Sequence, residues 1–119
     1  MADTPTATIH AHAEAVSAAD REQLLATATY PMFQGLDDGA KRWYQTVDEN
    51  LAVYADLQVR VELLEETILA QTEHVVLFSL IGQLFDRDDQ PLQRVHMLWA
   101  VHRVDDGWKV GWRQFLGPA

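Results

Sequence analysis

His96 and His102 are the side chains of this sequence best suited to proton transfer, because a neutral imidazole titrates close to physiological pH. Both stand on one face of residues 91–104, an alternating stretch that is typical of a β-strand. At about 3.3 Å per residue they lie roughly 20 Å apart, too far for one metal ion or one catalytic dyad. We therefore expect at most one of them to be catalytic, with His96 as the candidate general base.

Tyr30 and His12 are two further candidates from the first part of the chain. Tyr30 follows a predicted helix, and its hydroxyl can serve as a hydrogen-bond donor to a cavity; the alternative is a core ring with a satisfied hydroxyl. His12 shares a helical stripe with Ile9 and Val16. It is therefore either a functional residue or a buried histidine whose nitrogens are hydrogen-bonded.

Metal and cofactor chemistry have little support in the sequence. The chain contains no cysteine, which excludes disulfides, thiolate catalysis and cysteine-based zinc sites. No histidine pair at zinc-binding spacing is accompanied by a partnering acid. We predict neither a metal nor a cofactor.

Three helices and a run of strands must position these candidates. The predicted helices cover residues 5–19, 20–28 and 47–55, the last beginning with a capping box formed by Thr46 and Glu49. A short hairpin lies between the second and third helices. The long strands that follow are predicted at residues 57–63, 75–85, 91–104 and 108–116, with a turn at Asp105-Asp106-Gly107 before the last. Helices segregated from an antiparallel sheet define an α+β layout.

Composition limits the possible partners. The 119 residues are predicted to form a single domain, residues 1–119. The net charge of −9, from 9 basic and 18 acidic residues, disfavours nucleic acid and anionic membrane surfaces. Neither a signal peptide nor an 18-residue apolar span is recognisable, so a cytoplasmic location is expected. The helices can cover only one sheet face, and the second face keeps apolar positions, which predicts a homodimer through it.

Several short motifs, taken in order, resemble one superfamily. They are Ser17-Ala18-Ala19-Asp20, Tyr30-Pro31, Arg42-Trp43 and Asp106-Gly107-Trp108-Lys109-Val110. Their order and spacing over nearly the whole chain are similar to those of the nuclear transport factor 2-like superfamily, also called SnoaL-like or ketosteroid-isomerase-like. The resemblance implies a cone, in which a curved antiparallel (mixed) sheet wraps around the three helices and encloses a cavity.

The resemblance also identifies what this chain lacks. The stretch that resembles the isomerase acid falls near Ala100, and the strand that carries an acid in the cyclases has Trp112, Arg113 and Gln114 here. Both acid positions are therefore empty, which weakens the isomerase and cyclase interpretations. Histidine remains, with His96 as base and Tyr30 assisting. We expect the His96 face of its strand to point into the cone, opposite a wholly apolar face. The predicted pocket-lining residues are His12, Trp43, Leu98, Ala100, His102, Trp112 and Gln114.

Three functions stay open on this basis. The first is a homodimeric domain that binds a small apolar ligand in its pocket. The second is an enzyme on the same scaffold, an isomerase, cyclase, dehydratase or hydrolase that transfers protons through a histidine. The third is a protein-assembly module whose pocket is filled by its own side chains. An open cavity favours the first two, and a filled one favours the third.

Overall fold

The computed structural model describes residues 4–105 and 107–119. Its three helices are α1 (Pro5–Ala18), α2 (Arg21–Thr27) and α3 (Val47–Leu57). Each begins at a side-chain cap, and in α3 the Thr46 hydroxyl accepts from the backbone N–H of Glu49. The carboxylate of Glu49 in turn accepts from the backbone N–H of Gln45. The predicted helices are thus present, with α3 two residues longer than expected.

The strands form one mixed sheet. They are β1 (Ala28–Gly35), β2 (Lys41–Tyr44), β3 (Arg60–Gln71), β4 (Val75–Phe85), β5 (Pro91–Val104) and β6 (Gly107–Pro118). The order across the sheet is β2-β1-β6-β5-β4-β3. All neighbours are antiparallel except β1 and β6, which pair in parallel and join the hairpin to the long strands. Asp106, in the predicted turn before β6, lies outside the described residues.

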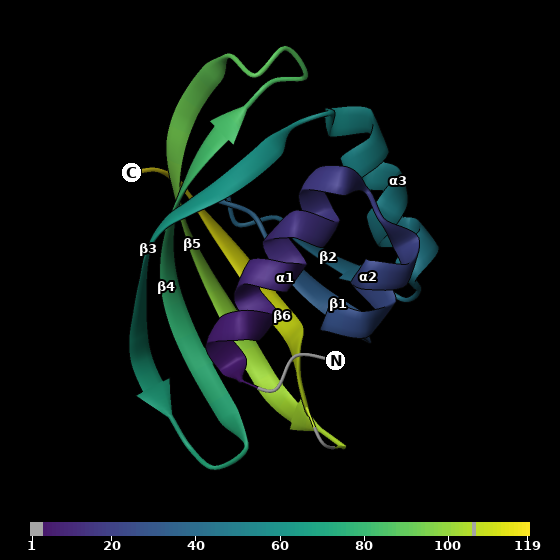
Figure 1. Cartoon of the computed structure of the whole chain (residues 1–119), viewed down its shortest axis with the longest axis vertical. Coiled ribbons are helices and arrows are strands. Elements are labelled where there is room, and N and C mark those ends of the chain that lie inside the picture. The colour runs from purple at the N-terminus through teal and green to yellow at the C-terminus, as the bar shows by residue number, and fades with distance from the viewer. Residues whose placement is uncertain (1–3, 106) are drawn as a thin grey trace.

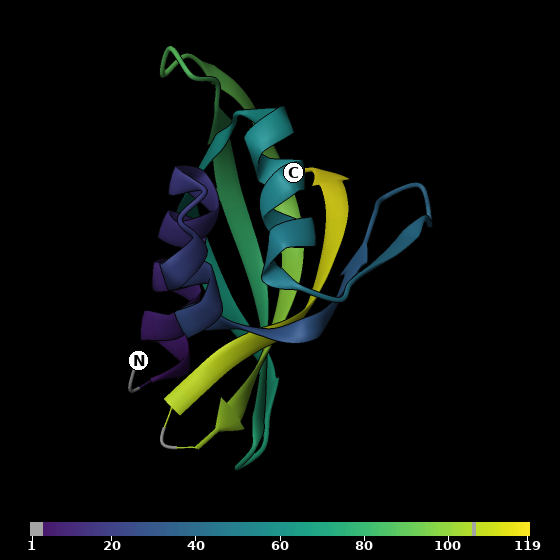
Figure 2. The ribbon, with the colours of Figure 1, turned by 90° about the vertical axis from the view of Figure 1, so that its right-hand side faces the viewer.

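The sheet curves around the helices and leaves its other face uncovered. Figure 1 shows all three helices on one side of the sheet, and Figure 2 shows β1 and β6 bending beneath α3. The sheet is not closed, because β2 and β3 remain free edges of the six-stranded order. This is the α+β roll expected from the sequence. Within the described residues, no helix is both long and apolar enough to cross a bilayer.

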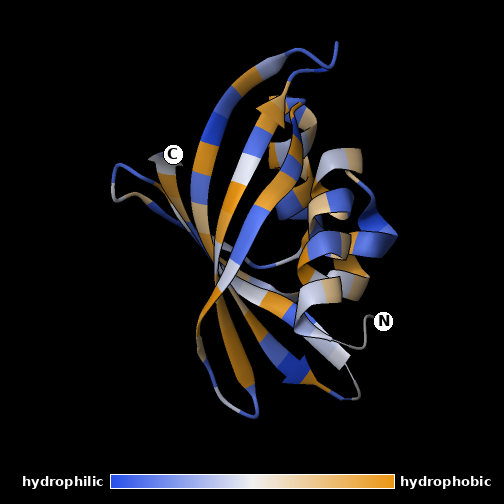
Figure 3. Ribbon diagram, turned by 60° about the vertical axis from the view of Figure 1, so that its left-hand side comes forward, coloured by the Kyte–Doolittle hydropathy of each residue, from blue (hydrophilic) through white to orange (hydrophobic). Residues whose placement is uncertain are grey.

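The main core lies between α1 and the inner sheet face. Ile9 and Ala13 of α1 pack against a cluster contributed by the last three strands. Its buried members there are Val76, Phe78, Leu80, Trp99, Val101, Trp108 and Val110. Figure 3 shows the hydrophobic and hydrophilic bands that alternate along these strands. Burial of this apolar surface is the largest favourable contribution to folding.

The predicted orientation of β5 is wrong. Val95, Trp99 and Val101 are buried against the helices, so the face that carries His96, Leu98, Ala100 and His102 points away from them. The reason is that the opposite face is wholly apolar and gains more free energy from burial than a face with two imidazoles. On the outer face each imidazole has a hydroxyl partner instead: His96 pairs with Ser79 and His102 with Thr29.

Candidate functional site

A cavity of about 400 Å³ opens between α3 and the inner face of the sheet. Most of its walls are aliphatic or aromatic. The polar groups that line it are few, and none of the described lining residues is Asp, Glu or His. The lining residues used below are Arg42 and Tyr44 of β2, Tyr54 of α3, Met97 and Trp99 of β5, and Arg113 and Gln114 of β6.

A bulge in β6 points Arg113 toward the helices. Ala100 pairs with Trp112 and the next residue, Val101, pairs with Val110, so Gly111 is an extra residue in β6. Without it, alternation from the buried Val110 would place Trp112 and Gln114 inward and Arg113 outward. Glycine suits the position because an added Cβ would come within 2.1 Å of the His102 ring. The result is an arginine that is only 2% exposed at the base of the cavity.

Two neutral side chains hold the Arg113 guanidinium. Its Nη1 group donates to Nε2 of His12 at 3.0 Å, and its Nη2 group donates to Oδ1 of Asn50 at 3.0 Å. His12 comes from α1 and Asn50 from α3, and both are fully buried. Three distant segments therefore converge on one charged group.

The proton positions in this network follow from donor and acceptor chemistry. An arginine can only donate, so Nε2 of His12 is the acceptor and the ring proton resides on Nδ1. Nδ1 then donates to the Thr27 hydroxyl at 3.0 Å, which donates to the backbone carbonyl of Gln23 at 2.8 Å. On the other side, Asn50 donates to the Tyr30 hydroxyl at 2.8 Å. We name the set of Arg113, His12, Thr27, Asn50 and Tyr30 the arginine network.

Burial keeps the neighbours of Arg113 neutral. Desolvation, followed by the positive charge of Arg113, lowers the pKa of His12 well below 6.5. Desolvation also raises the pKa of Tyr54 to about 12, against the opposing influence of Arg113. The guanidinium carbon lies 5.3 Å from the Tyr54 ring centre and 6.0 Å from that of Tyr44, close enough for cation–π attraction.

Arg113 has no ionic partner among residues 4–105 and 107–119, where every ion pair involves another base. Its Nε atom is buried and finds no hydrogen-bond acceptor within the described chain. Buried charges in proteins are normally paired, because an unpaired one loses its hydration without compensation. The base of the cavity thus carries an uncompensated positive charge.

Three residues predicted for the site lie at or beside the cavity. Gln114 borders the cavity, but the bulge turns its side chain to the outer face with its register partner Leu98, and its amide donates to the backbone carbonyl of Leu36. His12 lies one layer behind the lining, where it contacts Arg113 and meets the Trp99 ring edge-on at 5.1 Å. The hydroxyl of Tyr30 does not point freely into the cavity, because it accepts the hydrogen bond from Asn50.

The other predicted lining residues lie on the outer face of the sheet. His96, Leu98, Ala100 and His102 follow the orientation of β5 described above and do not line the cavity. Trp43 is 58% exposed and contacts Phe33, whose ring also stacks on Trp112. The bulge at Gly111 explains the error for Trp112, and simple alternation along β2 explains it for Trp43, because the adjacent Tyr44 takes the inward position.

Sequence reasoning missed Arg113 and Asn50 as functional candidates. Arg113 stands in the stretch where the family resemblance implies an acid, so that comparison indicates only a missing carboxylate. The one available signal was Gly111, since a glycine inside a strand pattern often marks a bulge that reverses the facing of later residues. Asn50 carries no comparable signal, because a polar residue in a helix is usually exposed.

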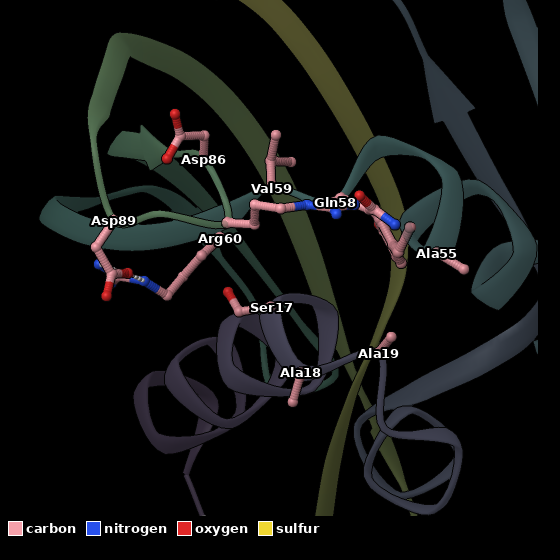
Figure 4. A pocket seen from close by; sticks show the side chains of 11 residues that line it. Ser17, Ala18, Ala19, Ala55, Gln58, Val59, Arg60, Asp86 and Asp89 are labelled. Carbon is pink, nitrogen blue, oxygen red and sulfur yellow. Dashed lines mark hydrogen bonds and ion pairs between the residues drawn. The ribbon is translucent and has the colours of Figure 1, made fainter.

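A second, more open hollow of about 500 Å³ adjoins the C-terminal ends of α1 and α3 and shares Tyr54 and Val59 with the lining of the main cavity. Figure 4 shows Ser17, Ala18 and Ala19 on one side of it and Arg60 on the other. Arg60 already pairs with Glu62 and with Asp89, and these partners are largely exposed. Because Arg60 already has two carboxylate partners within the chain, it is a less available partner for a ligand anion than Arg113.

No family model matches the chain, and no curated protein matches it. Among solved structures, an NTF2-like protein from Cytophaga hutchinsonii superposes with a TM-score of 0.74 at 16% identity, covering 92% of each chain. An NTF2-like protein of unknown function in nutrient uptake from Rhodospirillum rubrum gives 0.77 at 13% identity, over 98% of this chain and 100% of that one. A Nostoc punctiforme protein of unknown function with a cystatin-like fold gives 0.73 at 13% identity, over 97% and 93%.

These likenesses define the fold. At such identities they say nothing of ligand or reaction, since this architecture, like other widespread folds, hosts unrelated functions. The chain therefore has the nuclear transport factor 2-like fold that its sequence resembles.

Proposed function

We propose that this protein binds a small, largely apolar molecule in the cavity beneath α3. The observation that carries the proposal is the combination of a cavity of about 400 Å³ with mainly apolar walls and a few convergent polar groups. Small-molecule sites commonly have roughly this size and this composition. Among the polar groups, Arg113 is placed to orient a ligand whose apolar part the walls desolvate.

The composition of the lining favours binding over the two alternatives. A proton-transfer enzyme needs a base within hydrogen-bond reach of its substrate, and the described lining offers no carboxylate or imidazole. His96, the candidate base, lies on the opposite sheet face. An assembly module with a filled pocket is disfavoured because the cavity volume is that of a ligand rather than of packing defects.

Binding of a neutral fluorescent dye such as Nile red tests the proposal. The wild-type chain should bind the dye with a blue shift of its emission. Met97→Trp places a large ring in the cavity from β5 and should weaken binding by about tenfold or more. The matched control is Leu92→Trp, because Leu92 is an exposed residue of the same strand that lies outside the cavity. Equal binding by both variants would contradict the proposal.

We propose further that the protein is a homodimer through its uncovered sheet face. Strand register places a row of mainly apolar side chains across this face. The row consists of Trp43, Phe33, Trp112, Ala100, Leu77 and Ala70. A row of partly exposed apolar side chains on an uncovered sheet face is the kind of surface that proteins bury in an interface.

Sedimentation at micromolar concentration tests the dimer. Wild type and the control Leu25→Glu, at an exposed site of α2 on the helix side of the sheet, should sediment as dimers. Leu77→Glu should shift the protein toward monomer. A monomeric wild type would contradict the proposal. The cytoplasmic location stays a prediction, which fractionation of the producing cells would check.

A further inference from the structure

We propose that the ligand carries a carboxylate and that this carboxylate binds Arg113. The inference rests on the proposed function and adds the chemical class of the ligand. It starts from the burial of Arg113, which is 2% exposed while it lines the base of the cavity.

Every described group that faces the guanidinium is neutral. His12 contributes a ring nitrogen from α1, and Asn50 an amide oxygen from α3. Tyr54 and Tyr44 present their rings. On the neighbouring strands, the register partners of Arg113 are Gln34 in β1 and Trp99 in β5. Dipoles and aromatic faces thus surround the positive charge, but no described group neutralises it.

The donors of Arg113 are also incompletely used. A guanidinium carries more N–H groups than the pair that His12 and Asn50 accept, and Nε is left without an acceptor in the described chain. A carboxylate has the planar geometry and the charge that match such a donor edge. Because His12 and Asn50 already fix the guanidinium, little conformational freedom is lost when the anion binds.

The same surroundings favour a carboxylate over a phosphate ester. A phosphate monoester is close to doubly charged at neutral pH, and Arg113 is the only buried cation in the described lining. The second cation there, Arg42, is an exposed residue of β2. The apolar walls add the requirement of an apolar body. We therefore assign the site to apolar monocarboxylates, such as medium-chain fatty acids or arylalkanoates.

Octanoate and octanamide form the probe pair for the test, because they share a chain length and differ in charge. Calorimetry on the full chain should show that octanoate binds at least about tenfold more tightly than octanamide. Arg113→Gln should remove this preference. Arg42→Gln deletes the same charge at the exposed rim. It should lower octanoate affinity only slightly, and this loss should vanish at high salt, since exposed charges are screened more than buried ones.

Each outcome decides between the two proposals. If octanamide binds wild type as tightly as octanoate and both displace Nile red, the carboxylate inference falls and small-molecule binding stands. If octanoate binds equally well to folded Arg113→Gln, or if Met97→Trp leaves its binding unchanged, the inference falls as well. If none of the three probes binds, both proposals fall.

A second measurement does not depend on the folding of a variant. The Nε–H resonance of Arg113 in wild-type protein should shift on addition of octanoate and remain in place on addition of octanamide. An unmoved resonance in the presence of bound octanoate would overturn the inference.

Discussion

The Nε2 atom of His12 accepts a hydrogen bond from the Arg113 guanidinium at 3.0 Å, across 101 positions of sequence. Histidine acts here as a neutral acceptor, because one ring nitrogen of the neutral imidazole keeps a free lone pair. The contact exists only while the imidazole is unprotonated, because a protonated ring has no free lone pair and would face a like charge. The arginine network therefore depends on pH.

Stability should fall as the pH drops below the ordinary pKa of histidine. The pKa of His12 is lowered well below 6.5 in the folded chain, first by burial and then by the charge of Arg113. Below about pH 6.5 the unfolded chain binds a proton that the folded chain refuses, so unfolding is favoured. The limiting loss for one such group is about 1.4 kcal/mol per pH unit. Urea denaturation at several pH values between about 6.5 and 5 measures it.

His12→Gln serves as the comparison for this prediction. A glutamine amide can accept from Arg113 but does not titrate, so the variant's stability should change less with pH. Burial lowers the pKa of His102 as well. His102 therefore also makes the free energy of unfolding fall with decreasing pH, and part of this pH dependence should remain in the variant. Identical slopes in wild type and His12→Gln would contradict the assignment of the effect to His12.

Asn50→Leu should destabilise the fold. The substitution removes the acceptor for Nη2 of Arg113 and the donor to the Tyr30 hydroxyl, and both lie in the buried network. Hydrogen bonds to charged groups contribute about 1.5–3 kcal/mol, and a buried donor left unpaired adds to the loss. We expect the free energy of unfolding to fall by about 2–3 kcal/mol. Chemical denaturation compared with Ala52→Leu, a substitution at an exposed site in the same helix, measures the difference.

Asn50→Asp should occupy the anion site from within the chain. The new carboxylate is nearly isosteric with the amide and lies against Arg113, so it supplies the counter-ion that we assign to the ligand. Octanoate affinity should therefore fall by about tenfold or more, while octanamide affinity changes little. If Asn50→Asp is folded and binds octanoate as tightly as wild type, Arg113 does not bind the carboxylate.

Most of the fold was predictable because it follows from local patterns. The helix caps at Thr46 and Asp20 are short-range signals that the structure keeps. The strand predicted at residues 57–63 is present but begins at Arg60, because α3 extends to Leu57. The orientation of β5 could not be predicted from local patterns alone. Its two faces differ in polarity, and the apolar face that carries Val95 is the one buried against the helices. A rule that places the more apolar face inward would have given the correct orientation.

The site was harder to predict because its residues are far apart in the sequence and because its histidine acts as a neutral hydrogen-bond acceptor for an arginine. His12 and Tyr30 were identified as candidates from the sequence, but their connection through Arg113 and Asn50 depends on three elements meeting. The strand that resembles the acid-bearing strand of the cyclases carries Arg113, a base, in this chain. The charge sign of the site is therefore opposite to that of the acid sites that the resemblance implies.

Gly111→Ala should test why the β6 bulge, which turns Arg113 inward, requires a glycine. An alanine Cβ would come within 2.1 Å of Cε1 of His102 and 3.1 Å of the Thr29 hydroxyl. The imidazole would have to move and give up its 3.1 Å hydrogen bond with Thr29. Overpacking of this kind costs about 1–3 kcal/mol.

In a His102→Ala background the same substitution should cost clearly less, because the obstructing ring is gone. A double-mutant cycle by chemical denaturation gives this coupling directly. Equal costs in the two backgrounds would mean that His102 does not restrict the bulge, and a gain in stability from Gly111→Ala would contradict the requirement for glycine there.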